Sequence, residues 1–196
     1  MMEFLINLDK QIFLAINGFH SPFFDQVMYF LSMKLVWAPL YIALIVLMWS
    51  SCRRKFLVII PLIILMVTLT DQVSVALFKD VFQRLRPCHD PSLDGLVRIL
   101  HGHCGGQYGF ISSHASNTFG VAVFSGLVLR HRYVWVFPLL IFWAAAVSYS
   151  RIYLGVHFPA DVLVGAVVGA IIGWLIYALM KWLFKKWKKY RVSSLS

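Results

Sequence analysis

Ionisable and hydroxyl side chains gather in three short stretches of an otherwise apolar sequence. In chain order they are Lys79, Arg86, Ser112, Ser113, His114, Arg151, His157 and Asp161. Converging Lys and Arg side chains bind anions, most simply a phosphate. A histidine beside a carboxylate can act as a nucleophile near neutral pH. The residue types therefore indicate phosphoryl chemistry.

The third stretch combines the histidine and the carboxylate. His157 and Asp161 are four residues apart, so a helix that begins near them presents both on one face. Pro159 suits the first turn of such a helix, since its missing N–H would have no partner there. The carboxylate would then fix the imidazole tautomer and raise its nucleophilicity.

The second stretch reads as the start of a helix. Ser112 or Ser113 can cap it, and its first amides then point outward with the positive end of the helix dipole. A phosphate oxyanion binds well at such a position. His114, on the first turn, is placed to donate a proton to a leaving oxygen.

Each of these residues alone has an ordinary explanation. A single Lys or Arg at the end of a membrane helix commonly extends toward water, and a single His commonly packs. However, the three cations fall on the membrane face where the positive-inside rule disfavours them. Their convergence with two histidines and a carboxylate favours an anion pocket.

Composition indicates the kind of scaffold that carries these residues. The chain has 196 residues, 60% of them hydrophobic and 13% charged, against about 25% charged in an average soluble domain. We expect an all-α membrane protein in a single domain, 1–196. Apolar runs of spanning length cover 35–52, 56–78, 113–129, 134–150 and 160–183. Segment 22–33 is short and contains Asp25, so it is either a half-span or part of a sixth crossing.

The basic residues predict the orientation. They cluster at 53–55, 130–132 and 185–191, beside apolar runs, which indicates cytoplasmic ends of spans rather than a nucleic-acid partner. Residues 185–196 then form a basic cytoplasmic tail, and residues 79–112 and 151–159 lie on the outer face, where 79–112 is the active-site loop. Residues 1–20 have helical apolar spacing, which fits either an interfacial amphipathic helix or an ordinary packing helix.

These motifs resemble a known family. Lys79 to Pro87, Ser112 to His114, and Ser150 to Asp161 are similar to the three signature motifs of the type-2 phosphatidic acid phosphatases, which include membrane lipid phosphatases and soluble vanadium haloperoxidases. The first and third motifs match in full. The middle one departs, because Ile111 and Ser113 replace the usual Pro and Gly. A haloperoxidase is disfavoured, since those enzymes are soluble and much larger.

The resemblance implies a mechanism and its residues. His157 attacks phosphorus and forms a phosphohistidine, Asp161 orients His157, and His114 protonates the leaving group. The residues expected to bind the phosphoryl oxygens are Lys79, Arg86, Ser112 and Arg151, with amides near Ser113. No metal or cofactor is expected, because the cations neutralise the charge that magnesium neutralises in other phosphoryl-transfer enzymes.

Three cysteines and one intramembrane carboxylate complete the predictions. Cys88 and Cys104 lie on the oxidising face, which favours a disulfide over a zinc site with His89, His101 and His103. Cys52, beside the cytoplasmic cluster 53–55, is predicted to be a free thiol. Asp71, inside the second span, is predicted to make a buried structural hydrogen bond, and a catalytic role is the alternative.

The substrate is expected to be a membrane lipid phosphate. The short chain and outer-face site resemble bacterial inner-membrane enzymes that act on undecaprenyl diphosphate. Relatives acting on phosphatidylglycerol phosphate, phosphatidic acid or lipid A share the same motifs and are the alternatives. A transporter would carry more polar residues within its spans, and a non-catalytic lipid-binding protein would lack one of the catalytic residues.

Overall fold

The computed structural model describes residues 1–102 and 104–193, and its regular elements there are helices. They are α1 (Met2–Gly18), α2 (Pro22–Ser32), α3 (Ala38–Cys52), α4 (Phe56–Gln72), α5 (Asp80–Phe82), α6 (Ser113–Leu129), α7 (Val136–Tyr153) and α8 (Pro159–Ser193). A π-helical stretch, Val73–Lys79, joins α4 to α5 without a break. Short 3-10 turns occupy Leu35–Trp37, Arg53–Lys55, Pro87–His89, Pro91–Leu93 and Leu100–Gly102.

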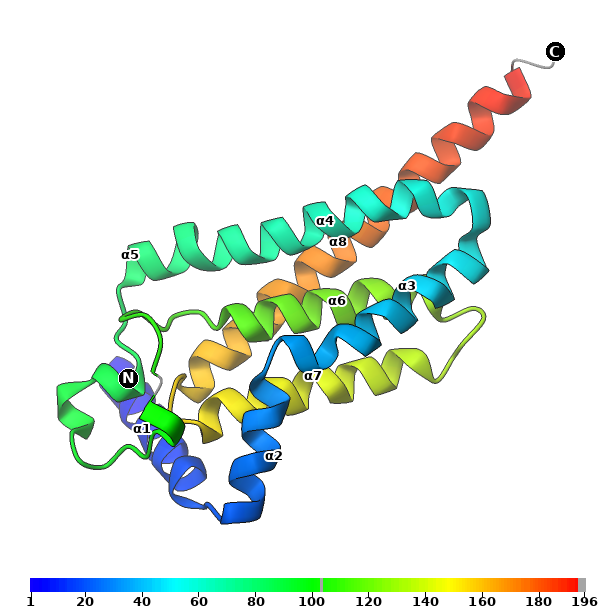
Figure 1. The fold of residues 1–196 in the computed structure, drawn as a ribbon. Helices are drawn as coiled ribbons and strands as arrows, with labels where there is room; N and C mark the ends of the chain where they lie inside the picture. Colours follow the sequence, from blue (N-terminus) through cyan, green and yellow to red (C-terminus); the bar gives the residue numbers. More distant parts are fainter. Residues whose placement is uncertain (103, 194–196) are drawn as a thin grey trace.

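The long helices form the predicted membrane bundle (Figure 1). Four of them are long and apolar enough to cross a bilayer: Leu35–Cys52, Phe56–Phe82, Val136–Tyr153 and Pro159–Lys188. Helix α6 has 17 residues, which meets the lower limit of about 17 residues for a spanning helix. Helix α2 has 11 residues and is too short to cross. The described residues thus provide five helices of spanning length.

The outer surface of the bundle suits a lipid environment. Large apolar side chains such as Leu57, Ile64, Phe142 and Leu163 are more than 60% exposed. A soluble protein rarely exposes such a continuous apolar surface. Lipid tails can surround these side chains. The helices form their own backbone hydrogen bonds, as the hydrocarbon core requires.

Helices α6 and α8 pack closely because glycines line their contact. A Cβ atom added to Gly165, Gly169 or Gly173 would lie 2.7, 2.1 or 2.6 Å from a carbonyl oxygen of α6 or of its N-cap residue. These glycines are four residues apart, the small-residue spacing that lets membrane helices approach each other. The approach places the start of α6 directly beside the start of α8, where Ser112 N–H donates to the Asp161 carbonyl at 3.0 Å.

The two ends of the bundle differ in chemistry, as the charge pattern predicts. At one end, Arg132 donates to the Ser50 carbonyl at 3.1 Å, and the Lys55 ammonium lies 5.4 Å from the Phe184 ring centre. These contacts bring the basic clusters together. At the other end lie α1, α2 and the connections 83–112 and 154–158 (Figure 1).

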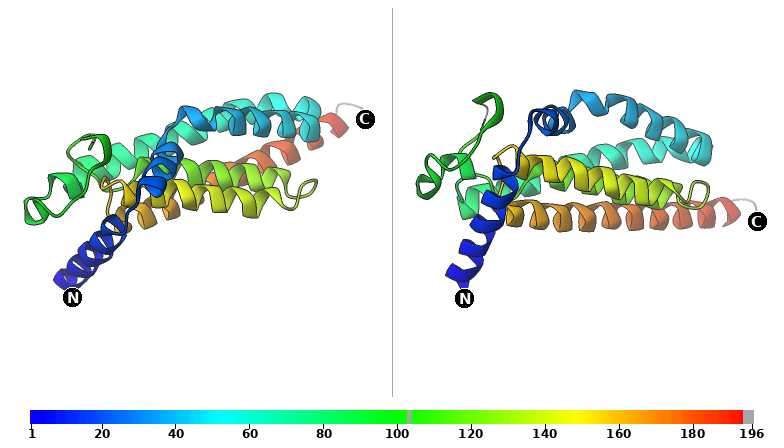
Figure 2. Two further views of the ribbon diagram at one scale, coloured as in Figure 1. Left: turned by 60° about the horizontal axis from the view of Figure 1, so that its bottom comes forward. Right: turned by 90° about the horizontal axis from the view of Figure 1, so that it is seen from below.

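Helix α1 crosses the end of the bundle that carries these connections (Figure 2). Its buried residues are Asp9, Phe13 and Asn17, whereas apolar residues such as Phe4 and Leu5 are exposed. Asn17 fixes the helix in place, since its side-chain amide donates to the carbonyls of Arg98 and Tyr153 at 2.9 and 2.8 Å. The buried face of α1 is therefore mixed, with Phe13 between two polar residues, and its exposed apolar residues fit contact with lipid.

Several predicted boundaries shift. The second span continues to Phe82, so Lys79 lies within a helix rather than at the start of the loop. Helix α8 continues through the basic segment to Ser193, and residues 194–196 lie outside the described part. The prediction for Asp71 is wrong, because its side chain is exposed on the second span. The periodicity of an apolar run does not reveal which of its faces is turned toward lipid.

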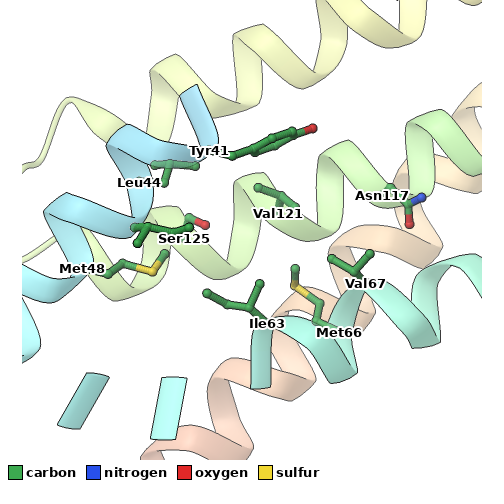
Figure 3. Close-up of a pocket in the computed structure, with 10 residues that line it drawn as sticks. Tyr41, Leu44, Met48, Ile63, Met66, Val67, Asn117, Val121 and Ser125 are labelled. Atoms are coloured by element: carbon green, nitrogen blue, oxygen red, sulfur yellow. The ribbon is translucent and has the colours of Figure 1, made fainter. Parts of the chain in front are cut away.

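An apolar cavity of about 290 Å³ lies between α3, α4 and α6. Figure 3 shows Met48, Met66 and Val121 around it, with Asn117 at one end. Asn117 accepts a hydrogen bond from the Thr70 hydroxyl at 2.5 Å and is one helical turn from His114. The cavity therefore lies within the bundle, close to the predicted site.

Candidate active site

His157 and Asp161 lie at the start of α8, as the spacing predicts. Pro159 is the first residue of the helix. His157 Nδ1 lies 3.5 Å from Asp161 Oδ2, and both side chains are buried. On the opposite side of the ring, His157 Nε2 lies 3.4 Å from Arg86 Nη1. Because a guanidinium can only donate, this contact favours the tautomer with the acceptor lone pair on Nε2 and the proton on Nδ1, which faces Asp161 but has no hydrogen-bond partner among the described residues.

The surroundings of His157 keep its ring uncharged. Its pKa lies well below the usual histidine range, chiefly because the side chain is buried and secondly because Arg86, Arg151 and Lys79 repel a further positive charge. The same three cations thus act on one imidazole, although they come from three separate parts of the sequence. A neutral imidazole has the lone pair that a nucleophile requires.

Arg86 is held beside His157 by the connection between α5 and α6. Its guanidinium donates to the carbonyls of Tyr108, Cys104 and Val156 at 3.3, 3.4 and 3.3 Å. Burial lowers the pKa of Arg86, although this pKa starts so high that the group stays charged. These three hydrogen bonds hold the buried guanidinium of Arg86 in a position where it can bind an anion.

The start of α6 forms the adjoining wall. Ser112 is the N-cap, and its hydroxyl accepts from the Ala115 N–H at 3.4 Å. Ser113 is the residue that replaces the usual glycine. Its hydroxyl accepts from Lys79 Nζ at 2.8 Å and contacts the hydroxyl of Ser74 at 2.7 Å. Ser113 therefore holds Lys79 at the helix start, where a phosphate oxygen would bind.

His114 and Arg151 line a cavity of about 260 Å³ on the α2 side of the site. Arg151 Nη1 donates to the Ser32 hydroxyl at the end of α2. Arg151 Nε is buried and has no hydrogen-bond partner among the described residues. A bound phosphoryl oxygen would supply that partner. The remaining lining includes Ser32, Lys34, Leu100 and Val156.

Comparison with known proteins agrees with this arrangement. The model of the PAP2 superfamily matches residues 56–185. This chain belongs to the PAP2 superfamily. The match includes all three motifs, and it makes the protein a lipid phosphatase of that family with a lipid phosphate as substrate.

The relatives of this PAP2 phosphatase include lipid A 4'-phosphatases. The enzyme of Bacteroides thetaiotaomicron is 38% identical over 90% of this chain and 79% of its own length. That of Porphyromonas gingivalis is 35% identical over 95% of this chain and 78% of its own length. The putative undecaprenyl-diphosphatase of Escherichia coli is 28% identical over 85% of this chain and 80% of its own length.

A solved structure has the same fold. The crystal structure of Aquifex aeolicus LpxE aligns with a TM-score of 0.66 at 27% identity, covering 86% of this chain and 94% of that one. Together with the spanning helices, this makes the PAP2 phosphatase a multi-pass membrane protein of a bacterial lipid phosphatase family.

The structure adds residues that the motifs of this PAP2 phosphatase do not indicate. Arg84 Nη1 donates to Asp161 Oδ1 at 2.8 Å, and Arg84 Nη2 donates to Asp9 Oδ2 at 2.6 Å. Ser32, the last residue of α2, and Lys34, two residues beyond it, line the cavity beside His114. The one signal in the sequence was Asp9, a carboxylate within an apolar helical pattern, since such a residue needs a partner when buried.

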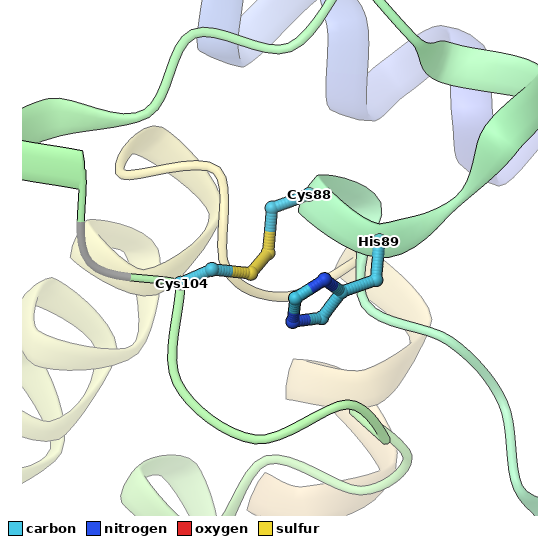
Figure 4. Close-up of side chains that lie close together, drawn as sticks. All are labelled: Cys88, His89 and Cys104. Carbon is cyan, nitrogen blue, oxygen red and sulfur yellow. A yellow bond between two sulfur atoms is a disulfide. The ribbon is translucent and has the colours of Figure 1, made fainter.

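Cys88 and Cys104 form a disulfide with Cα atoms 6.1 Å apart (Figure 4), and Cys52 is free. His89 lies beside the bond, and these three residues are close enough to hold a metal ion. Sulfur atoms joined to each other are not thiolates, so they do not provide the zinc site that was the alternative. That alternative also required His101 and His103, whose side chains lie outside the described part.

Proposed function

We propose that residues 1–196 form one domain that removes a phosphate from a glycolipid of the lipid A class. The reaction takes place at the outer face of the inner membrane and proceeds through a phosphohistidine on His157. The observation that carries the choice of substrate is the identity of 38% and 35% with two lipid A 4'-phosphatases over nearly the whole chain.

His157 Nε2 is the proposed nucleophile. It attacks phosphorus and forms an N–P bond while the bond from phosphorus to the leaving oxygen breaks. The ring then carries a positive charge, which Asp161 stabilises from the Nδ1 side. Their 3.5 Å separation would shorten as the charge develops, because catalytic hydrogen bonds often tighten in the transition state.

His114 is the proposed acid. It lies on the first turn of α6 and lines the cavity with Arg151, so its proton reaches the leaving oxygen of a phosphate held by the cations. Water then attacks the phosphohistidine, which releases inorganic phosphate and restores the neutral imidazole of His157. The proposed binding groups for the phosphoryl oxygens are Lys79, Arg86, Ser112, Arg151 and the amides near Ser113.

The cavity beside His114 is the proposed site for the leaving group. If His114 protonates the leaving oxygen, the rest of that molecule extends into the space lined by Ser32 and Lys34. Hydroxyl and ammonium groups there suit a polar headgroup such as a sugar. The apolar cavity of about 290 Å³ between α3, α4 and α6 suits an acyl chain of the same lipid.

Undecaprenyl diphosphate is the second candidate. It is favoured by the 28% identity with the putative undecaprenyl-diphosphatase of Escherichia coli. It ranks below lipid A because two lipid A 4'-phosphatases are 38% and 35% identical.

A substrate panel tests the proposal. Phosphate release from lipid A, undecaprenyl diphosphate, phosphatidylglycerol phosphate and phosphatidic acid is measured with the purified protein in detergent. We expect the largest kcat/KM with lipid A and loss of the 4'-phosphate in the product's mass spectrum. A larger kcat/KM with any other lipid of the panel would reject lipid A as the substrate.

Lys34→Gln tests the proposed leaving-group site within the same panel. The substitution should raise KM for lipid A and leave KM for a small aryl phosphate unchanged, because the aryl group does not reach Lys34. Equal changes for both substrates would contradict the proposed leaving-group site.

A further inference from the structure

A chain of charged contacts connects α1 to the proposed catalytic carboxylate. Asp9 lies in the middle of α1, and its Oδ2 accepts from Arg84 Nη2 at 2.6 Å. The other nitrogen of the same guanidinium, Nη1, donates to Asp161 Oδ1 at 2.8 Å. Arg84 therefore joins two carboxylates that lie near opposite ends of the sequence.

Asp9 and Arg84 each make a further contact with the start of α8. Asp9 Oδ1 accepts from the Ala160 N–H at 2.9 Å, in the first turn of α8. The Arg84 guanidinium also lies 4.2 Å from the ring centre of Phe158. The side chain of Asp161 is fully buried, that of Asp9 is 10% exposed and that of Arg84 is 25% exposed. Asp9 and Arg84 also line a cavity of about 550 Å³. Water is therefore excluded at Asp161 but reaches Arg84, and the two ion pairs limit how the guanidinium can turn.

These contacts determine which oxygen of Asp161 faces the imidazole. Oδ1 is taken by Arg84, whereas Oδ2 accepts from the Phe158 N–H at 3.0 Å and faces His157 Nδ1 at 3.5 Å. Without Arg84, Oδ1 would be buried and unpaired, and the carboxylate would turn to recover a partner. Such a rotation would remove the group that orients His157.

We propose that Asp9 and Arg84 are positioning residues that hold Asp161 in register with His157, so that α1 is part of the active site. The inference rests on the roles given above to His157 and Asp161, but not on the identity of the lipid. Neither residue touches the phosphoryl group. Both act through the orientation of Asp161, as an outer residue orients a ligand or a base in other enzymes.

The variants are assayed on a small aryl phosphate as well as on a lipid phosphate, in the full-length protein. Asp9→Asn keeps the acceptor for the Ala160 N–H and removes the charge that holds Arg84. We expect kcat to fall roughly tenfold, with KM little changed, because the anion pocket is intact. Arg84→Gln should lower kcat further, and Arg84→Lys should recover part of the loss.

The double variant tests whether the two residues act through one path. If they do, Asp9→Asn combined with Arg84→Gln should have the kcat of Arg84→Gln alone, since residues in one network are not additive. If the two losses multiply, Asp9 does not act through Arg84 and the proposal is wrong.

Asp25→Asn is the matched control. Asp25 pairs with Arg98 at 2.8 and 2.5 Å, is similarly enclosed and also joins a helix to the outer connection. It contacts none of the proposed catalytic groups. Both Asn variants should lower the melting temperature, but only Asp9→Asn should lower kcat of the folded enzyme. Equal values of kcat in the two variants would overturn the proposal, and the aryl phosphate gives this answer even if lipid A is not the substrate.

Discussion

His157 and His114 lie in one site but are expected to respond differently to the substrate. His157→Ala removes the nucleophile, so turnover should be lost on every substrate. His114→Ala removes only a proton donor, and a good leaving group needs less protonation. An aryl phosphate should therefore retain more of its kcat than a lipid monoester does. Parallel assays of both variants on both substrates give the comparison, and equal losses would contradict the two roles.

The buried neutral state of His157 also has a consequence for stability. The folded protein keeps the ring uncharged, because the pKa of His157 is lowered well below 6.5. The unfolded chain binds a proton at that position below about pH 6.5. The unfolded state then carries more protons, so the free energy of unfolding decreases as the pH falls from 7 to 5.

His157→Gln removes this contribution. We expect the melting temperature of the wild type to fall more steeply between pH 7 and 5 than that of the variant, in the same detergent. The histidines remote from His157 contribute about equally to both proteins and cancel. Two parallel curves would show that His157 is not held neutral by its surroundings.

The residues of the three motifs could be predicted from the sequence, because their types and spacing are those of the family. His157 and Asp161 share a helix start because their separation of four follows from helix geometry. Arg84 and Asp9 could not be paired in this way. Their contact depends on how α1 lies across the end of the bundle, and no local spacing contains that information.

Among the elements, the connection between α5 and α6 is held by a covalent bond. The disulfide between Cys88 and Cys104 closes a loop with a separation of 16 residues, and a loop of that size stabilises the fold by about 3 kcal/mol in the chain-entropy model. Arg86 donates to the carbonyl of Cys104. The bond therefore also limits the motion of Arg86, which is proposed to bind the phosphate.

Cys88→Ser should lower the melting temperature and the activity together. A thiol reductant should have the same effect on the wild type and no effect on the variant. Cys52→Ser is the control, because Cys52 is a free thiol at the other end of the bundle. Peptide mapping without reduction checks the bond itself. Alkylation of Cys88 and Cys104 in unreduced protein would show that the bond is absent.

Most ends of the spanning helices were predictable to within a few residues, because long apolar runs leave little choice of structure in a membrane, but α8 continues to Ser193, well beyond the predicted end at 183. The extension of the second span to Phe82 was not predictable, since it depends on a π-helical stretch that ends at Lys79. Such stretches occur often at functional sites, and here the stretch lies where Lys79 meets Ser113. The exposure of Asp71 depends equally on the packing of the whole bundle.

For the whole molecule, the separation of charge predicts the orientation in the membrane. Cysteines are introduced at Lys188, in the basic segment, and at Leu96, in the outer connection, after replacement of Cys52 by Ser. An impermeant thiol reagent added to intact cells should label position 96 and not position 188, since basic clusters stay in the cytoplasm. Labelling of position 188 without lysis would show that the orientation is opposite to the predicted one.

In the proposed reaction, phosphate passes through His157 without a metal ion. The most direct measurement is to mix the purified protein with a lipid phosphate in EDTA, stop the reaction in alkali during the first turnover, and map the phosphorylated peptide by mass spectrometry. We expect phosphate on His157 and none in His157→Gln. Phosphate on a different side chain, or a first turnover that occurs only after magnesium is added, would contradict the proposed reaction.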